Sequence, residues 1–262
     1  MSTRDSFRDR FDLRRLPTVA LVTYVIALLA WVAIISRWLP IAGGTNVRMS
    51  DPGVPEAMAL ANGLTGIGLY LIMWGVMMTA MMYPSSVPFF RLYYKTLDGT
   101  TKTGKATRVG AVMGTYALVW TLVGVVPLVV NAVVPIAVLA NAHGGLLVGG
   151  TLLLLAGYQL SPYKHRCLRY CQSPMGFLFS HHRPGVRGAI RMSWEYSIFC
   201  IGCCWALFVF MVVVGSMNIV WMALIAVVLS LERTVAWGRQ LAQAVGILAG
   251  TAGIAIIVIT IT

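Results

Sequence analysis

The sequence predicts an all-α protein, a bundle of about seven transmembrane helices, and three observations lead to that expectation. Hydrophobic residues make up 58% of the 262 residues, whereas charged residues make up only 11%. The apolar residues gather into long runs that short polar or charged stretches separate. The basic residues concentrate in alternate connections between these runs. Because soluble domains carry roughly 25% charged residues, the composition excludes an ordinary cytosolic protein.

Seven apolar runs are candidate membrane spans and set the order of the elements. They cover residues 18–39, 66–90, 110–139, 144–160, 194–215, 218–231 and 241–262. Most of them reach the roughly 17–25 residues that a transmembrane helix needs. The sixth run is short enough to be a half-length or tilted element, so six or eight helices remain alternatives. We expect the first run to be a retained anchor, since no convincing small-residue cleavage site follows it.

The basic residues predict the orientation in the membrane. Eighteen of the 20 lysines and arginines lie before the first run or between residues 91–108, 164–191 and 233–239. Such connections favour the cytoplasmic side, which places the N-terminus in the cytoplasm and the C-terminus outside, in a prokaryotic cytoplasmic membrane. The net charge of +12 is therefore a topology signal. The expected partner is the lipid bilayer and not a nucleic acid, because the charges lie in short loops beside membrane ends.

The chain divides into a basic arm at residues 1–17 and one transmembrane domain at residues 18–262. Residues 161–193 form the largest cytoplasmic loop, and they contain cysteines and histidines. Pro127 and Pro135 should kink or end the third span. Small residues four apart, which let helix backbones approach closely, occur at Gly145 and Gly149 and again near the C-terminus at Gly246 and Gly250, with Gly253 close behind.

Three cysteines in the fifth span form the most informative motif. Cys200, Cys203 and Cys204 occupy positions i, i+3 and i+4, so a helix points their sulfurs to one side. Thiolates bind soft metal ions well. A single buried cysteine is a small apolar packing residue, but three within five residues fit that interpretation poorly. We therefore expect a metal or redox role, within the inner leaflet.

Methionines in the second span are weaker candidates for the same site. Met77 and Met81 share one helical stripe, and Met78 and Met82 share its neighbour. A methionine stripe is usually core packing. However, Met78, Met81 and Met82 fall at a membrane depth similar to that of the cysteines, and mixed thioether and thiolate ligands suit Cu(I) best.

The cytoplasmic loop adds Cys167 and Cys171. If Ser161 and Pro162 begin a short helix, with the proline in its first turn, the two cysteines share a face and form half of a soft-metal site. The alternative is a pair of free surface thiols. Two acids near the membrane ends, Glu195 and Glu232, have simpler interpretations: each faces water or pairs with a nearby arginine.

At these residues the chain resembles an uncharacterised prokaryotic family of predicted metal-binding integral membrane proteins. The resemblance runs from about residue 66 to residue 240. It rests on the methionine block at 73–85, the segment from Gly157 to Cys171, the Cys-Ile-Gly-Cys-Cys-Trp block at 200–205, and the block at 215–222. Tyr163 and the Glu232-Arg233 pair depart from the family's usual residues, and we expect neither departure to touch a candidate ligand. The resemblance implies metal binding, with copper often suggested, but no established reaction.

Together these features predict a membrane-embedded copper chaperone or delivery factor for a membrane-bound cuproprotein. The expected cargo is Cu(I), with zinc or another soft metal as alternatives. Its predicted ligands are the five cysteines and three methionines at Cys200, Cys203, Cys204, Cys167, Cys171, Met78, Met81 and Met82. A metal conduit and an accessory subunit of a larger membrane complex remain open. The sequence shows no phosphate-binding loop, nucleophile elbow or zinc-protease helix, so we expect no enzyme.

Overall fold

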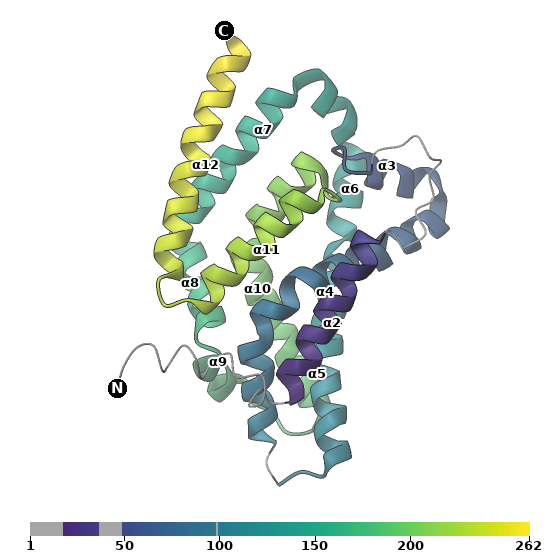
Figure 1. The fold of residues 1–262 in the computed structure, drawn as a ribbon, viewed down its shortest axis with the longest axis vertical. Coiled ribbons are helices and arrows are strands. Elements are labelled where there is room, and N and C mark those ends of the chain that lie inside the picture. The colour runs from purple at the N-terminus through teal and green to yellow at the C-terminus, as the bar shows by residue number, and fades with distance from the viewer. Residues whose placement is uncertain (1–17, 37–48, 98) are drawn as a thin grey trace.

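The computed structural model describes residues 18–36, 49–97 and 99–262, which form helices and no strand (Figure 1). The helices, in order, are α2 (Thr18–Ile35), α3 (Val54–Ala61), α4 (Gly63–Thr96), α5 (Lys102–Val123), α6 (Val125–Val133), α7 (Ile136–Leu160), α8 (Pro162–Gln172), α9 (Pro174–His181), α10 (Gly185–Gly215), α11 (Ile219–Thr234) and α12 (Gly238–Ile261). The all-α prediction is confirmed. The predicted arm at residues 1–17, and Arg37 and Arg48, lie outside the described residues.

Six of these helical segments are long and apolar enough to cross a membrane. They are α2, α4, the α5–α6 pair, α7, α10 and α12. The short sixth run of the sequence becomes α11, which has 16 residues. Large apolar side chains such as Leu28 and Leu248 are 63% and 68% exposed on the bundle surface. An apolar outer surface of this kind suits the hydrocarbon core of a bilayer, which offers no hydrogen-bond partners to polar side chains.

Helix α4 contains two prolines, and the neighbouring helix α2 satisfies a backbone group that one of them leaves free. Pro84 has no N–H to donate to the carbonyl of Ala80, four residues earlier. The indole Nε1 of Trp31 on α2 donates to that carbonyl over 3.1 Å. Long α4 therefore continues through its proline while the same hydrogen bond ties α2 to it.

The predicted third span is divided at both of the places where the sequence carries a helix breaker. Gly124 separates α5 from α6, and a Cβ there would lie 2.7 Å from the Trp74 ring. Pro127 lies in the first turn of α6, and Pro135 precedes α7. The prediction that the prolines interrupt this span is confirmed. Helix α7 consequently begins at Ile136, and it is kinked at His143, directly before the predicted start at residue 144.

Helices α7 and α12 pack closely through the small residues that the sequence singled out. A Cβ on Gly149 would lie 3.1 Å from the carbonyl oxygen of Gly253, and a Cβ on Gly253 would lie 2.9 Å from that of Gly149. The backbones therefore approach as small-residue motifs in membranes allow. Successive long helices alternate in direction (Figure 1): α4, α7 and α11 run down the view, and α5, α10 and α12 run up it. The α4–α5, α7–α10 and α11–α12 connections consequently share one end of the bundle.

Candidate metal centre

The short helix predicted after Ser161 is present as α8, and its first turn explains its position. The Ser161 hydroxyl accepts a hydrogen bond from the backbone N–H of Lys164 over 3.2 Å, and Pro162 occupies the first turn. Serine at this position satisfies an N–H that has no partner within the helix. Helix α8 therefore starts directly after α7 and packs against α10 and α11.

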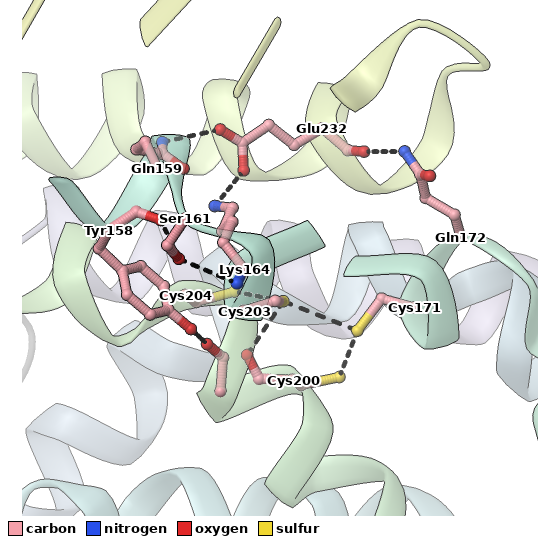
Figure 2. Close-up of polar contacts among 11 residues, drawn as sticks. Tyr158, Gln159, Ser161, Lys164, Cys171, Gln172, Cys200, Cys203, Cys204 and Glu232 are labelled. Atoms are coloured by element: carbon pink, nitrogen blue, oxygen red, sulfur yellow. Dashed lines mark hydrogen bonds and ion pairs between the residues drawn. The ribbon is translucent and has the colours of Figure 1, made fainter. Parts of the chain in front are cut away.

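Four cysteines from α8 and α10 form a buried group, which we call the thiol cluster: Cys171, Cys200, Cys203 and Cys204 (Figure 2). The Sγ atom of Cys171 lies 3.6 Å from that of Cys200 and 3.6 Å from that of Cys203. The Sγ atoms of Cys203 and Cys204 are 3.2 Å apart. No side chain of the cluster is more than 5% exposed. The cluster thus joins the i, i+3, i+4 motif of one helix to a single thiol of another.

Cys167 shares helix α8 with Cys171 but occupies a different place. It is half-buried and lies against Gly202, where an added Cβ would be 3.1 Å from its Sγ atom. The missing side chain at Gly202 therefore lets α8 approach α10. Burial, and then repulsion from Cys203 and Cys200, raises the pKa of the Cys167 thiol. The structure places this residue beside the thiol cluster and not among its contacting sulfurs.

The Cys171 thiol has a higher pKa than an ordinary thiol because of its place in the thiol cluster. Its hydrogen bonds with Cys200 and Cys203, and then its burial, raise the pKa of Cys171 well above the usual range of a thiol. The Cys203 thiol in turn donates to the carbonyl of Cys200 over 3.1 Å. Because a thiol must lose its proton to bind a metal ion, a metal ion bound here would displace this proton.

The three candidate methionines of α4 belong to the same apolar core as the thiol cluster. Met78, Met81 and Met82 are fully buried. The carbonyl of Met82 accepts hydrogen bonds from the hydroxyls of Ser85 and Ser86, each over 2.9 Å. The hydroxyls of these two serines also accept hydrogen bonds from Arg233, which in turn donates to Cys200, so a polar link runs from α4 to the thiol cluster. Met81 and Met82 lie about one helical turn from Ser85 and Met78 about two turns from it, while the role of all three as ligands stays a prediction.

Arg233 completes the link and is the main feature that sequence reasoning missed. The expectation that the Glu232-Arg233 pair touches no candidate ligand is wrong, because the Arg233 side chain reaches Cys200. Its guanidinium donates to the Sγ atom of Cys200 over 3.0 Å and to the Ser85 hydroxyl over 2.7 Å. Further hydrogen bonds reach the hydroxyls of Ser86, Tyr116 and Tyr196. The side chain is only 3% exposed. A cation buried among neutral hydroxyls carries a desolvation penalty of several kcal/mol unless an anion accompanies it.

Glu232 does not pair with Arg233, contrary to one of the interpretations of the sequence. Its carboxylate accepts from the Lys164 ammonium over 2.7 Å and from the Gln159 amide over 2.9 Å (Figure 2). The two charged side chains are each 1% exposed. The pair ties α8 to α11 and leaves Arg233 without this carboxylate. The other acid, Glu195, pairs with Arg191 over 3.2 Å, in agreement with its structural interpretation.

Within the described ranges, no set of three or more His, Cys, Asp and Glu side chains is arranged to hold a metal ion as it stands. The donor chemistry nevertheless fits a soft ion, since thiolates select such metals. With a metal–thiolate bond of about 2.3 Å, two sulfurs that share one ion lie about 3.8–4.6 Å apart. The 3.6 Å separations at Cys171 would have to widen by no more than about 1 Å on that bond length.

Comparison with known protein families identifies the class of protein. The copper chaperone family PpoB2 matches residues 71–256, which include α8, α10, α11 and most of α4. The chain therefore belongs to this copper chaperone family. The match agrees with the copper-chaperone function expected from the sequence. No curated protein and no solved structure matches the chain.

Proposed function

We propose that this copper chaperone carries Cu(I) on the thiol cluster and delivers it to a membrane-bound cuproprotein. The observation that supports the proposal is the meeting of four buried thiols, with Cys171 3.6 Å from both Cys200 and Cys203. Two or three thiolates satisfy Cu(I), and thiolates are among its preferred ligands. Copper is cargo here, so the site must release the ion as well as bind it.

The surrounding residues suit a transfer by exchange of sulfur ligands. Cys167 lies one helical turn before Cys171 and is partly exposed, which suits a thiol that receives the ion first. The ion would then pass to weaker thioether ligands on α4, which are Met78, Met81 and Met82. Soft ligands exchange by replacing one sulfur with another, so the ion need not be released to water.

The proposed setting is a prokaryotic cytoplasmic membrane with the N-terminus inside. The basic residues around the α4–α5 and α7–α10 connections support this orientation, because positive residues favour the cytoplasmic side. The thiol cluster would then lie toward the cytoplasmic end. A metal conduit and an accessory subunit of a membrane complex stay predictions.

Copper analysis of the purified protein tests the proposal. Protein loaded with Cu(I) and freed of excess ion should retain copper in the parent and lose it in the Cys200/Cys203/Cys204→Ser triple variant. A matched control, Cys167→Ser, should retain it. Equal copper in the parent and the triple variant would end the proposal.

A further inference from the structure

Arg233 carries a positive charge into the interior of the bundle, and hydroxyl groups fix its position there. The residue lies in the last turn of α11, and its side chain is buried. The guanidinium donates hydrogen bonds to hydroxyls on α4, α5 and α10, over 2.7 Å to Ser85, 3.3 Å to Ser86, 3.4 Å to Tyr116 and 3.1 Å to Tyr196. The charged group is therefore held in one place by three other helices.

Among the described residues, no carboxylate balances the charge of Arg233. An arginine side chain keeps its proton in proteins, so this charge is permanent. Its partners are the hydroxyls and the Sγ atom of Cys200, at 3.0 Å. The acid next to it in the sequence, Glu232, pairs with Lys164 over 2.7 Å. A buried cation without an anion carries a large desolvation penalty, and the Cys200 sulfur is the contacting atom that becomes a thiolate when a metal ion binds.

We infer that Arg233 sets the charge of the metal centre that the thiol cluster can hold, and that it favours one monovalent ion bound by two thiolates. This inference rests on the proposed function. A Cu(I) ion with two thiolates carries one negative charge, which the guanidinium balances. Cys200 is the thiolate in contact with Arg233, and the Sγ atom of Cys171 lies 3.6 Å from it. A zinc ion with four thiolates carries two negative charges, so one of them would stay unbalanced in the protein interior.

Metal binding exchanges protons for the ion and changes no oxidation state. Two S–H bonds break, two Cu–S bonds form, the two protons pass to solvent, and copper stays Cu(I). The charge of Arg233 is the same before and after this step. The metal-free site holds an unbalanced cation, whereas the loaded site is neutral as a whole. Arg233 therefore contributes to binding through Cys200, as a positioning residue that does not touch the ion.

Silver and mercury ions separate an effect of charge from a general effect on structure. Ag(I) and Hg(II) are both soft ions that bind thiolates, but with two thiolates the Hg(II) centre is neutral and needs no cation. Arg233→Gln removes the charge, whereas Arg233→Lys keeps it and also loses the forked hydrogen bonds. We expect Arg233→Gln to bind Cu(I) and Ag(I) about 100-fold or more weakly than Arg233→Lys, because the thiolate centre loses its buried counter-charge. The Hg(II) affinities of the two variants should differ by no more than about threefold, as for a substitution that removes no important contact.

A second pair of variants neutralises the charge without replacing Arg233. Ser85→Asp introduces a carboxylate where the hydroxyl now accepts from the guanidinium over 2.7 Å, and Ser85→Asn is the neutral control of equal size. The new carboxylate would pair with the guanidinium, so the affinity for Ag(I) should be about tenfold or more below that of Ser85→Asn. The affinity for Hg(II) should be the same in both. Arg191→Gln, which removes an exposed arginine of α10, should change neither affinity.

Competition with chelators of known affinity measures each binding constant on protein purified in detergent. If Arg233→Gln does not fold, the Ser85 pair gives the same comparison. Equal losses of Ag(I) and Hg(II) affinity would show that Arg233 acts only on the structure, and no loss of either would show that its charge plays no part. Each of these results would overturn the inference. Failure of the proposed function looks different, because the parent would then hold neither Cu(I) nor Ag(I).

Discussion

The two cysteines of α8 provide a matched pair of substitutions that separates a ligand from a neighbour. Cys171→Ser and Cys167→Ser make the same chemical change on the same helix, four residues apart. The structure places the Cys171 sulfur in contact with Cys200 and Cys203, both at 3.6 Å, and places Cys167 against Gly202. We expect Cys171→Ser to weaken Cu(I) binding strongly and Cys167→Ser to leave the equilibrium affinity nearly unchanged.

The size of the effect follows from what the substitution removes. Replacing a group that only supports a metal ligand reduces affinity by about 10–100-fold, so loss of a ligand itself should cost at least about 100-fold. That ratio corresponds to about 2.8 kcal/mol of binding free energy. Cys167→Ser changes a half-buried side chain outside the contacting sulfurs, so we expect a change within about 0.5 kcal/mol.

Competition with a chromophoric Cu(I) chelator measures both affinities on protein purified in detergent. Size-exclusion profiles and helical circular dichroism should be the same for both variants, which confirms that each is folded. Equal losses in the two variants would refute the placement of Cys171 in the cluster. A larger loss in Cys167→Ser would show that the other face of α8 carries the ligand.

Three other features yield further predictions. Lys164→Met alone should lower the free energy of unfolding by about 3–5 kcal/mol, because it leaves the Glu232 charge buried and unpaired. The double variant Lys164→Met with Glu232→Leu should recover most of this loss in thermal unfolding. Equal Tm values for the single and the double variant would contradict this prediction. Gly202→Val should lower the free energy of unfolding by about 1–3 kcal/mol through overpacking against Cys167. In a double-mutant cycle, Cys167→Ala should restore part of that loss. Strictly additive effects of the two substitutions would exclude this contact as the cause. Burial raises the pKa of Glu56 on α3, so the folded protein binds the carboxyl proton more tightly, and the stability should fall as the pH rises through that pKa. In Glu56→Gln this part of the pH dependence of Tm should disappear. An unchanged profile of Tm against pH would exclude Glu56 as its source.

The helices and the cysteine motif were predictable because both depend on local sequence. Apolar runs of membrane length identified the six long helical segments, and the short run at 218–231 became α11. The spacing of Cys200, Cys203 and Cys204 placed them together on one helix, as the structure has them. Ser161 and Pro162 predicted the start of α8. Each of these inferences needs only neighbours within a few residues.

The partners across helices were not predictable in the same way. Cys167 and Cys171 have equal status in the sequence, and only the position of α8 on α10 distinguishes them. Arg233 and Lys164 were counted as basic loop residues, yet both are buried. Their burial depends on how α11 packs against α4 and α8, more than 60 residues away along the chain. A weak signal existed in the position of Glu232 and Arg233 at a helix end near membrane depth, where charged residues are rare unless they are paired or functional.

X-ray absorption at the copper edge of the loaded protein tests the central claim most directly. The claim is that sulfurs from α8 and α10 share one Cu(I) ion. The account predicts a monovalent edge, a first shell made of sulfur only, and the loss of that shell in the Cys200/Cys203/Cys204→Ser variant. A first shell of nitrogen or oxygen atoms, or a sulfur shell that survives in this variant, would contradict it.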